Sequence, residues 1–262
     1  MSAFLAAFWA ETLKARRSRL SWLSIAGLSI LPAVAGLFMA ILKNPDQARA
    51  LGLISLKARL AAGAADWPTF YMMLTQGAAI GGAMLFAIIA AWVFGREFSD
   101  HTAKELLALP TPRWVIVSAK LALMAVWILL LTLWIAGLGL VIGTAVEIPG
   151  GSVDLNWTAF ESLLGISLLN FLLMPFVALF ASVGRGYLPP VGWALLTVML
   201  AQISVVLGWG DWFPWAVPAL FSGMAGPRAE QLGAHSYLAV GLAFVAGVAL
   251  TVVWWRGADQ AR

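Results

Sequence analysis

Long runs of apolar residues recur six times along the chain. Each run holds about 20 predominantly apolar positions, the length that a helix needs to cross the ~30 Å hydrocarbon core of a bilayer. The runs are too long and too continuously apolar for the strands of a membrane barrel. Backbone groups in lipid must bond within their own segment, so the runs predict helices. The predicted spans are residues 20–42, 70–94, 114–145, 158–183, 189–209 and 236–255.

The pattern predicts an all-α membrane protein, with residues 1–262 forming one transmembrane domain. We find no internal repeat, low-complexity tract or long linker. The third run is long enough to begin in the headgroup region or to tilt. The first run follows four basic residues, as a signal peptide does, but it exceeds the roughly 7–15 apolar residues of such a signal. It is therefore predicted to be an uncleaved first span.

Two further segments are predicted beside the spans. Residues 4–14 carry apolar side chains at helical spacing, with Glu11 and Lys14 on the opposite face, which predicts an amphipathic helix lying in the membrane interface. The alternative is that residues 4–14 only extend the first span. Three Trp and two Pro within residues 209–218 are typical of an interfacial aromatic belt with broken backbone. They predict a re-entrant segment between the fifth and sixth spans.

Composition and charge define the class and the orientation. The chain is 62% hydrophobic and 11% charged, whereas soluble domains carry roughly 25% charged residues. The net charge of +4 is interpreted as a topology signal rather than as nucleic-acid binding. With the N-terminus inside, the inner segments hold eleven Lys and Arg and the outer segments hold five. This difference predicts both termini in the cytoplasm, in a bacterial or archaeal plasma membrane, with reversed topology as the alternative.

One loop opposes this rule locally. Residues 43–69 carry four of the five outer basic residues. We interpret the loop as an interfacial helix that rests on the bilayer through its apolar residues.

The motifs of catalysis and metal binding are absent from the sequence. Without cysteine there is neither a disulfide nor a thiolate metal site, and two histidines do not make a His-rich centre. The chain contains no H-E-x-x-H, no G-x-S-x-G and no G-x-x-x-x-G-K-[ST] motif. We therefore expect no enzyme activity, no metal and no cofactor bound by this chain. Any ATP-driven work needs a second polypeptide.

The densest block of polar residues between two spans lies at residues 95–113. Treated as one helix over residues 97–109, it has a polar and an apolar face. The polar face is Glu97, Asp100, His101, Lys104 and Glu105, and the other face is Phe98, Thr102, Leu106 and Leu109. Pro110 would end this helix, since proline cannot donate to the helical ladder. The pattern predicts a short amphipathic helix at the cytoplasmic surface that contacts a partner, with a solvated helix without a partner as the alternative.

The sequence Arg96-Glu-Phe-Ser-Asp-x-Thr-x-Lys-x-Leu-Leu-x-Leu-Pro-x-x-Arg113, followed by Lys120-Leu, resembles the signature segment of the type-2 ABC export permeases. That family has a Glu after a long second span, then a Thr, a Leu-Leu-x-x-Pro and an Arg before the third span. His101 is a departure, because the family often has Gly at this position. The resemblance extends over the six-span layout, although only this segment carries specific residues.

The resemblance implies the membrane subunit of an ATP-driven exporter without its own motor. The segment would be the coupling helix that docks into a separate cytoplasmic ATPase, which binds ATP and Mg²⁺. Two permease subunits, identical or different, and two ATPase subunits would form the working unit. The expected contact with the ATPase is Glu97, Phe98, Asp100, His101, Thr102, Lys104, Glu105 and Leu106. Arg96, Arg113 and Lys120 are expected at the lipid headgroups.

Polar residues inside the predicted spans are the remaining candidates. Gln76, Asn170 and Gln202 are expected to face the bundle interior. There they line a translocation path, or they cross-link helices at about 0.6 kcal/mol each. The pairs Gly77-x-x-x-Gly81 and Gly139-x-x-x-Gly143 permit close helix contact and are a weak signal for a dimer seam. The substrate is not encoded in any motif.

Two other functions remain open at this stage. One is an ATP-independent secondary transporter or channel, which inverted repeats or charges at mid-span would favour. The other is a membrane scaffold for enzyme assembly.

Overall fold

The computed structural model describes residues 2–43, 64–108, 110–224, 226 and 231–257, and within these ranges it contains helices and no strands. Six helices are long and apolar enough to cross a membrane, so the predicted all-α fold with six spans is confirmed. Each apolar run found in the sequence falls on one of them. They are Arg19–Lys43, Trp67–Ser99, Arg113–Ala145, Val153–Val183, Leu188–Leu207 and Ala234–Gly257.

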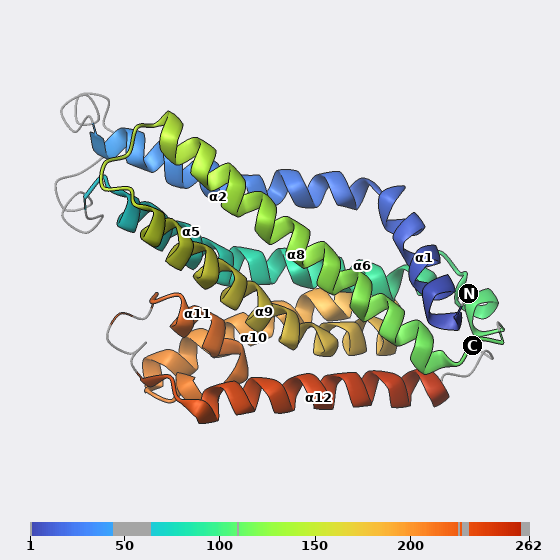
Figure 1. Ribbon diagram of the computed structural model, residues 1–262. Helices are drawn as coiled ribbons and strands as arrows, with labels where there is room; N and C mark the ends of the chain where they lie inside the picture. Colours follow the sequence, from blue (N-terminus) through green and yellow to red (C-terminus); the bar gives the residue numbers. More distant parts are fainter. Residues whose placement is uncertain (1, 44–63, 109, 225, 227–230, 258–262) are drawn as a thin grey trace.

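The long helices run along one axis, so that α1 and the end of the last helix lie at the same end of the bundle (Figure 1). We call this the α1 end. Helices α2 (Arg19–Lys43) and α8 (Arg113–Ala145) pack together along one side of the bundle. Helix α9 (Val153–Val183) is central, because it packs against α8, against α10 (Leu188–Leu207) and against α12 (Ala234–Gly257). Most of the expected interfacial helix in residues 43–69 falls on residues 44–63, outside the described residues.

The second span is built from three segments. Helix α5 (Trp67–Gly77) continues into a π-helical turn, η1 (Ala78–Gly82), and then into α6 (Ala83–Ser99). Single π turns inside α-helices are frequent at functional sites, because the extra residue shifts the backbone hydrogen bonds. The amide Nδ2 of Asn170, on α9, lies 3.3 Å from the carbonyl oxygen of Ala78 and 3.4 Å from that of Ala79. The central helix thus binds the second span at its irregular turn.

Polar residues at the helix ends explain where several helices begin and stop. The Asp66 carboxylate accepts from the Thr69 amide at the start of α5, and the Ser152 hydroxyl accepts from the Leu155 amide at the start of α9. Helix α10 stops at Gly208, whose φ of 88° is left-handed and favours glycine.

Glycines allow close approach inside the subunit. A Cβ atom at Gly143 would lie 2.3 Å from the ring of Trp67, and one at Gly77 would lie 3.1 Å from Leu31 on α2. These glycines therefore serve packing between the spans of one chain.

A helix is present where residues 4–14 predicted one, as α1 (Ala3–Arg16), and it is separate from the first span. The alternative, a simple extension of that span, is wrong, because the chain turns at Arg17 and Ser18 before α2 begins (Figure 1). Leu5 and Trp9 are 52% and 56% exposed, while Glu11 is buried. Glu11 therefore faces the protein together with Phe8 and Ala15, which pack on the core, while Leu5 and Trp9 point outward.

The chain between α10 and α12 has the broken backbone that its Trp and Pro residues predict. It forms two 3₁₀ turns, η2 (Gly210–Trp212) and η3 (Pro214–Ala216), and the short helix α11 (Val217–Phe221). Helix α11 packs against α9 and also contacts η1. Val217 and Leu220 are buried, so α11 belongs to the helical core, whereas Trp212 of η2 is exposed.

Candidate functional site

The polar segment after the second span forms a sharp corner at the α1 end of the bundle (Figure 1). Helix α6 stops at Ser99, and the short helix α7 (Ala103–Leu107) begins after Thr102. We call residues 100–105 the corner. The expectation of a single helix over residues 97–109 is therefore wrong. Leu109 itself lies outside the described residues.

A left-handed residue ends α6. His101 has a φ of 59°, its amide donates to the carbonyl oxygen of Phe98 (3.3 Å), and the next amide, that of Thr102, donates to the carbonyl oxygen of Glu97 (2.9 Å). This pair of bonds is the Schellman arrangement, in which the left-handed position is usually glycine. The left-handed backbone at this position explains why glycine is common there, although this chain has histidine.

The corner presents most of the expected contact residues to solvent. Asp100, His101, Thr102, Lys104 and Glu105 are all exposed. Leu106 is partly buried against the core. Phe98 turns into the bundle, with its ring 5.7 Å from that of Trp254 and 6.0 Å from that of Trp255 on α12. Phe98 therefore anchors the corner to α12.

Glu97 lies inside the protein rather than on the exposed face. Its Oε1 atom accepts from Lys120 Nζ at 2.7 Å and from Lys14 Nζ at 3.0 Å. Lys120 Nζ also donates to Glu11 Oε2 at 3.1 Å and to the carbonyl oxygen of Val93 at 2.6 Å. Lys14 completes the arrangement with Glu11 Oε1 at 2.6 Å. We call Glu11, Lys14, Glu97 and Lys120 the ion cluster.

The ion cluster joins α1, α6 and α8. Glu11, Glu97 and Lys120 are 4%, 3% and 0% exposed. Burial lowers the pKa of the Lys14 ammonium, but the carboxylates of Glu97 and Glu11 outweigh that effect and hold this pKa above its ordinary value. Lys14 therefore remains charged at neutral pH. Two cations and two anions balance, as buried charges must to be tolerated.

Two expectations are corrected by the ion cluster. Glu97 does not share a surface with the corner, and Lys120 does not reach the lipid headgroups, because both side chains are enclosed by α1 and α8. Periodicity placed Glu97 on the correct face of its helix but did not reveal that another helix covers that face. The sequence did contain a signal for this burial. Glu11 and Lys14 were predicted on the charged face of residues 4–14, so charged partners for Glu97 and Lys120 were available.

The two arginines at the ends of the segment have partners within the chain. Arg96 Nε lies 3.0 Å from Asp100 Oδ2, and its guanidinium stacks 5.0 Å from the ring centre of Trp92. Arg113 Nη1 donates to the carbonyl oxygens of Trp255 (2.7 Å) and Arg256 (2.8 Å). Carbonyls in the last turn of a helix lack helical partners, so Arg113 caps α12.

A polar pocket of about 430 Å³ opens beside the ion cluster and the corner. Three cationic side chains and one carboxylate line it. They are Lys14, Arg17, Arg96 and Asp100. The pocket therefore has an excess of positive charge.

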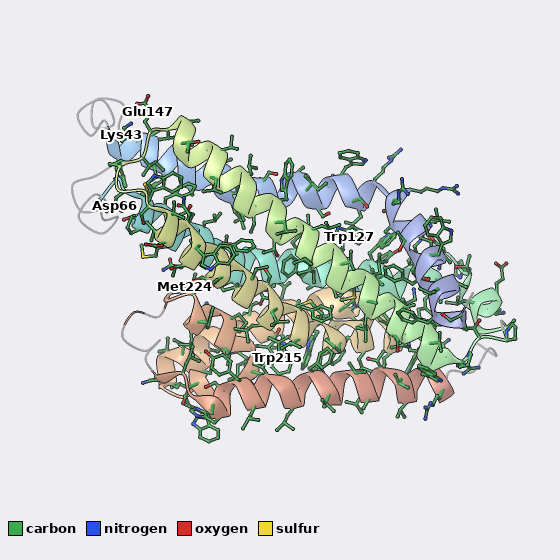
Figure 2. The ribbon with its side chains drawn as sticks, in the orientation of Figure 1. Lys43, Asp66, Trp127, Glu147, Trp215 and Met224 are labelled. Carbon is green, nitrogen blue, oxygen red and sulfur yellow. The ribbon has the colours of Figure 1, made fainter. Side chains whose placement is uncertain are left out.

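The polar residues at mid-span are only partly brought together. Asn170 is buried, and it lines a small cavity of about 40 Å³ between α6, α9 and α10, together with Gln202 and Trp215 (Figure 2). This volume is close to the ~30 Å³ that a single water occupies in the liquid, so the cavity has room for little more than one water. Gln202 is otherwise exposed on α10. Gln76 is half-buried on α5 and does not line this cavity.

A histidine–carboxylate pair at the opposite end was not expected from sequence. His235 Nε2 lies 2.8 Å from Asp211 Oδ2, and the ring of Trp212 stacks on the imidazole at 4.5 Å. The pair ties the 3₁₀ turn η2 to the start of α12. Among the described residues, no group of three or more His, Cys, Asp and Glu side chains gathers as a metal site would require.

Six spans, an exposed polar corner and a buried ion cluster beneath it define a polytopic membrane protein whose polar chemistry lies at one end. Residues 7–201 match the family model described as ABC-2 family transporter protein, and the chain belongs to this family. It is a membrane permease subunit of an ABC transporter, a class that works with ABC ATPase subunits. The matched range begins within α1, includes the ion cluster and the corner, and ends within α10.

A curated relative supports the same class. The bacitracin transport permease protein BCRB of Bacillus licheniformis is 29% identical to this chain over 183 residues. The aligned region covers 68% of this chain and 85% of that protein.

Proposed function

We propose that this permease couples ATP hydrolysis by a separate ATPase to export, and that the corner is the surface on which the ATPase acts. The observation that carries the proposal is the contrast along one short segment. Four residues are exposed at the α1 end, namely Asp100, His101, Lys104 and Glu105. Glu97, three residues before Asp100, is buried in the bundle and forms an ion pair there. The corner is thus an exposed polar surface that is rigidly attached to the bundle.

The attachment explains how a push on the corner would move the bundle. The amides of His101 and Thr102 join the corner to α6 through one backbone hydrogen bond each, and Glu97 joins α6 to α8 and α1 through Lys120 and Lys14. Pulling α6 away from α8 alone would strand buried charges, which is strongly unfavourable. Helices α1, α6 and α8 therefore move together, and ATP binding shifts the bundle only if the ATPase contacts its two states differently.

The displacement would reach the middle of the bundle through α6. The π turn at the start of this helix is bound by Asn170 of α9, and the small cavity between α6, α9 and α10 lies beside that contact. We propose that this cavity is the place where the translocation path opens, with Asn170 and Gln202 in its wall.

The orientation follows from the same proposal. The corner and α1 lie at one end, so an ATPase at the corner puts this end in the cytoplasm, in agreement with the excess of Lys and Arg in the inner segments. A bacterial or archaeal plasma membrane and a second permease subunit, identical or different, complete the assembly. ATP and Mg²⁺ would be held by the ATPase. The name of the Bacillus licheniformis relative makes bacitracin the first compound to test as cargo.

The test uses charge reversal at the corner. The double variant Lys104→Glu with Glu105→Lys keeps the net charge and leaves the ion cluster intact. We expect it to lose co-purification with the ATPase in detergent and to lose ATP-driven transport in proteoliposomes. Asp154→Lys is the matched control, because Asp154 is exposed at the opposite end of the bundle. Association and transport that survive the corner variant would refute the proposal, and transport driven by an ion gradient without ATP would favour a secondary transporter.

A further inference from the structure

A second concave feature of the α1 end lies on the outer side of the bundle. A groove of about 730 Å³ runs between α1, α2 and α8. Its volume falls within the range of roughly 300–1,000 Å³ that is common for ligand pockets. Three tryptophans line it along most of its length, and Arg16 stands in the wall that α1 contributes. These tryptophans are Trp22, Trp127 and Trp134.

The long wall of the groove offers ring carbons and methyl groups rather than hydrogen bonds. The indole N–H of Trp127 already donates to Ser24 Oγ at 3.2 Å, and that of Trp134 donates to Ser29 Oγ at 2.9 Å. Figure 2 shows Trp127 where α8 faces α2. The hydroxyl of Thr12 likewise donates to the carbonyl oxygen of Phe8 at 2.8 Å. An occupant of this part of the groove must be apolar.

Arg16 is different from the other polar groups in the wall. Its side chain is exposed, and it forms no ion pair with any acidic residue in the described part of the chain. Its neighbour Lys14 is engaged in the ion cluster. Arg17 and Arg19, on either side of the bend between α1 and α2, are also exposed. One end of the groove thus presents a cation that lacks a counter-charge among these residues.

The length of the groove matches one leaflet of a bilayer. From Leu123 to Trp134 the axis of α8 rises about 16 Å, and half of the hydrocarbon core is roughly 15 Å. The arginine lies at the α1 end of the groove, where the chain bends out of the first span. The groove therefore extends from headgroup level into the hydrocarbon of that leaflet.

We propose that this groove binds an acyl chain of an anionic phospholipid, whose phosphate pairs with Arg16. Apolar walls, leaflet length and a cation at the headgroup end are the three properties that such a lipid requires, and basic pockets between spans bind anionic headgroups on this basis. A second copy of the chain fits less well. A two-fold seam brings the same patch of both copies together, and a seam over this groove would bury Arg16 of each copy without a counter-charge from the groove of the other.

The experiment measures lipid retention by the intact protein. The purified, delipidated permease is titrated with phosphatidylglycerol or phosphatidylcholine and examined by native mass spectrometry. Arg16→Gln is expected to weaken phosphatidylglycerol binding by about fivefold or more, which corresponds to the loss of one basic residue beside an anionic lipid. Phosphatidylcholine binding is expected to change little. Arg19→Gln is the matched control, because Arg19 is exposed at the same bend but does not line the groove.

A second pair of variants tests the apolar wall. Val126→Trp fills the groove from α8 and is expected to reduce retention of both lipids, whereas Val141→Trp alters an exposed position of the same helix outside the groove. Equal loss with Arg16→Gln and Arg19→Gln would mean general surface attraction and would overturn the proposal. The chain contains no cysteine, so a single Val126→Cys variant is also informative. Disulfide-linked dimers of that variant in native membranes would show that a second copy covers the groove, which would also overturn the proposal.

Discussion

Lys120 of α8 and Glu97 of α6 form an ion pair of 2.7 Å in the interior of the bundle, directly beneath an exposed polar corner. The pair is reinforced by Glu11 and Lys14 from α1. Three helices that are distant in sequence are therefore held together by four charges, of which only Lys14 is partly exposed. This relationship connects the surface proposed for the ATPase to the body of the permease.

Breaking this pair on one side is expected to destabilise the protein strongly. Lys120→Met leaves Glu97 and Glu11 buried with one half-exposed lysine between them. Loss of one partner of a buried ion pair typically costs about 3–5 kcal/mol. The measurement is the thermal unfolding midpoint in detergent. Lys104→Met, at the exposed corner, is the control and is expected to stay within about 0.5 kcal/mol.

Removing both partners is expected to restore part of that loss. The double variant Lys120→Met with Glu97→Met keeps the Glu11–Lys14 pair at 2.6 Å and leaves no unbalanced charge in the cluster. The double-mutant cycle should therefore give a coupling free energy of roughly 1–3 kcal/mol. Simple additivity of the two single losses would contradict an interaction between these side chains.

Glycine at the left-handed position is expected to strengthen the corner. His101 pays a steric penalty of about 1–2 kcal/mol for its left-handed backbone, which glycine avoids. His101→Gly should slow hydrogen–deuterium exchange of the amides at 101 and 102, which bond to the last carbonyls of α6. His101→Val should accelerate it, because a β-branched residue is disfavoured there. Faster exchange in His101→Gly than in the unchanged protein would contradict the cap.

Two glycines of α8 are expected to respond in opposite ways to alanine. A Cβ atom at Gly143 would lie 2.3 Å from the Trp67 ring, so Gly143→Ala should destabilise the protein by about 1–3 kcal/mol. At Gly137 nothing lies within 4 Å of the added atom, and alanine should be neutral or stabilise by up to about 1 kcal/mol. Thermal unfolding of both variants checks the prediction, which fails if they behave alike.

The pair at the opposite end is expected to hold the broken segment to α12. Asp211→Ala removes the acceptor of His235 and should loosen the 3₁₀ turn η2. Because His235 is 34% exposed, the expected loss of stability is modest, about 1 kcal/mol. Limited proteolysis between α10 and α12 should become faster. His235→Ala should have a similar effect, and the double variant should add little to either.

The sequence was most informative where the signal is local. Apolar runs located all six spans, and the opposed faces of residues 4–14 predicted α1. Trp and Pro residues predicted the irregular backbone after α10. The sequence was less informative at the corner. Glycine commonly marks the end of a helix, but here His101 ends α6, so the helix predicted from periodicity extended past this end. For Asn170 the sequence left two roles open, cross-linking of helices and lining of a translocation path. Its contacts with η1 agree with the first role. Its place in the wall of the small cavity is the basis on which the second role is proposed.

By itself, the sequence determined that this is a six-span helical membrane protein with a polar segment after its second span, since hydrophobic length and the order of residues are properties of a continuous stretch. Only the tertiary structure decided which charges in and around that segment are exposed and which are buried. Glu97 and Lys120 are neighbours because α1, α6 and α8 pack against one another, and that packing depends on contacts between residues far apart in the chain. The exposed corner therefore begins at Asp100, after the buried Glu97.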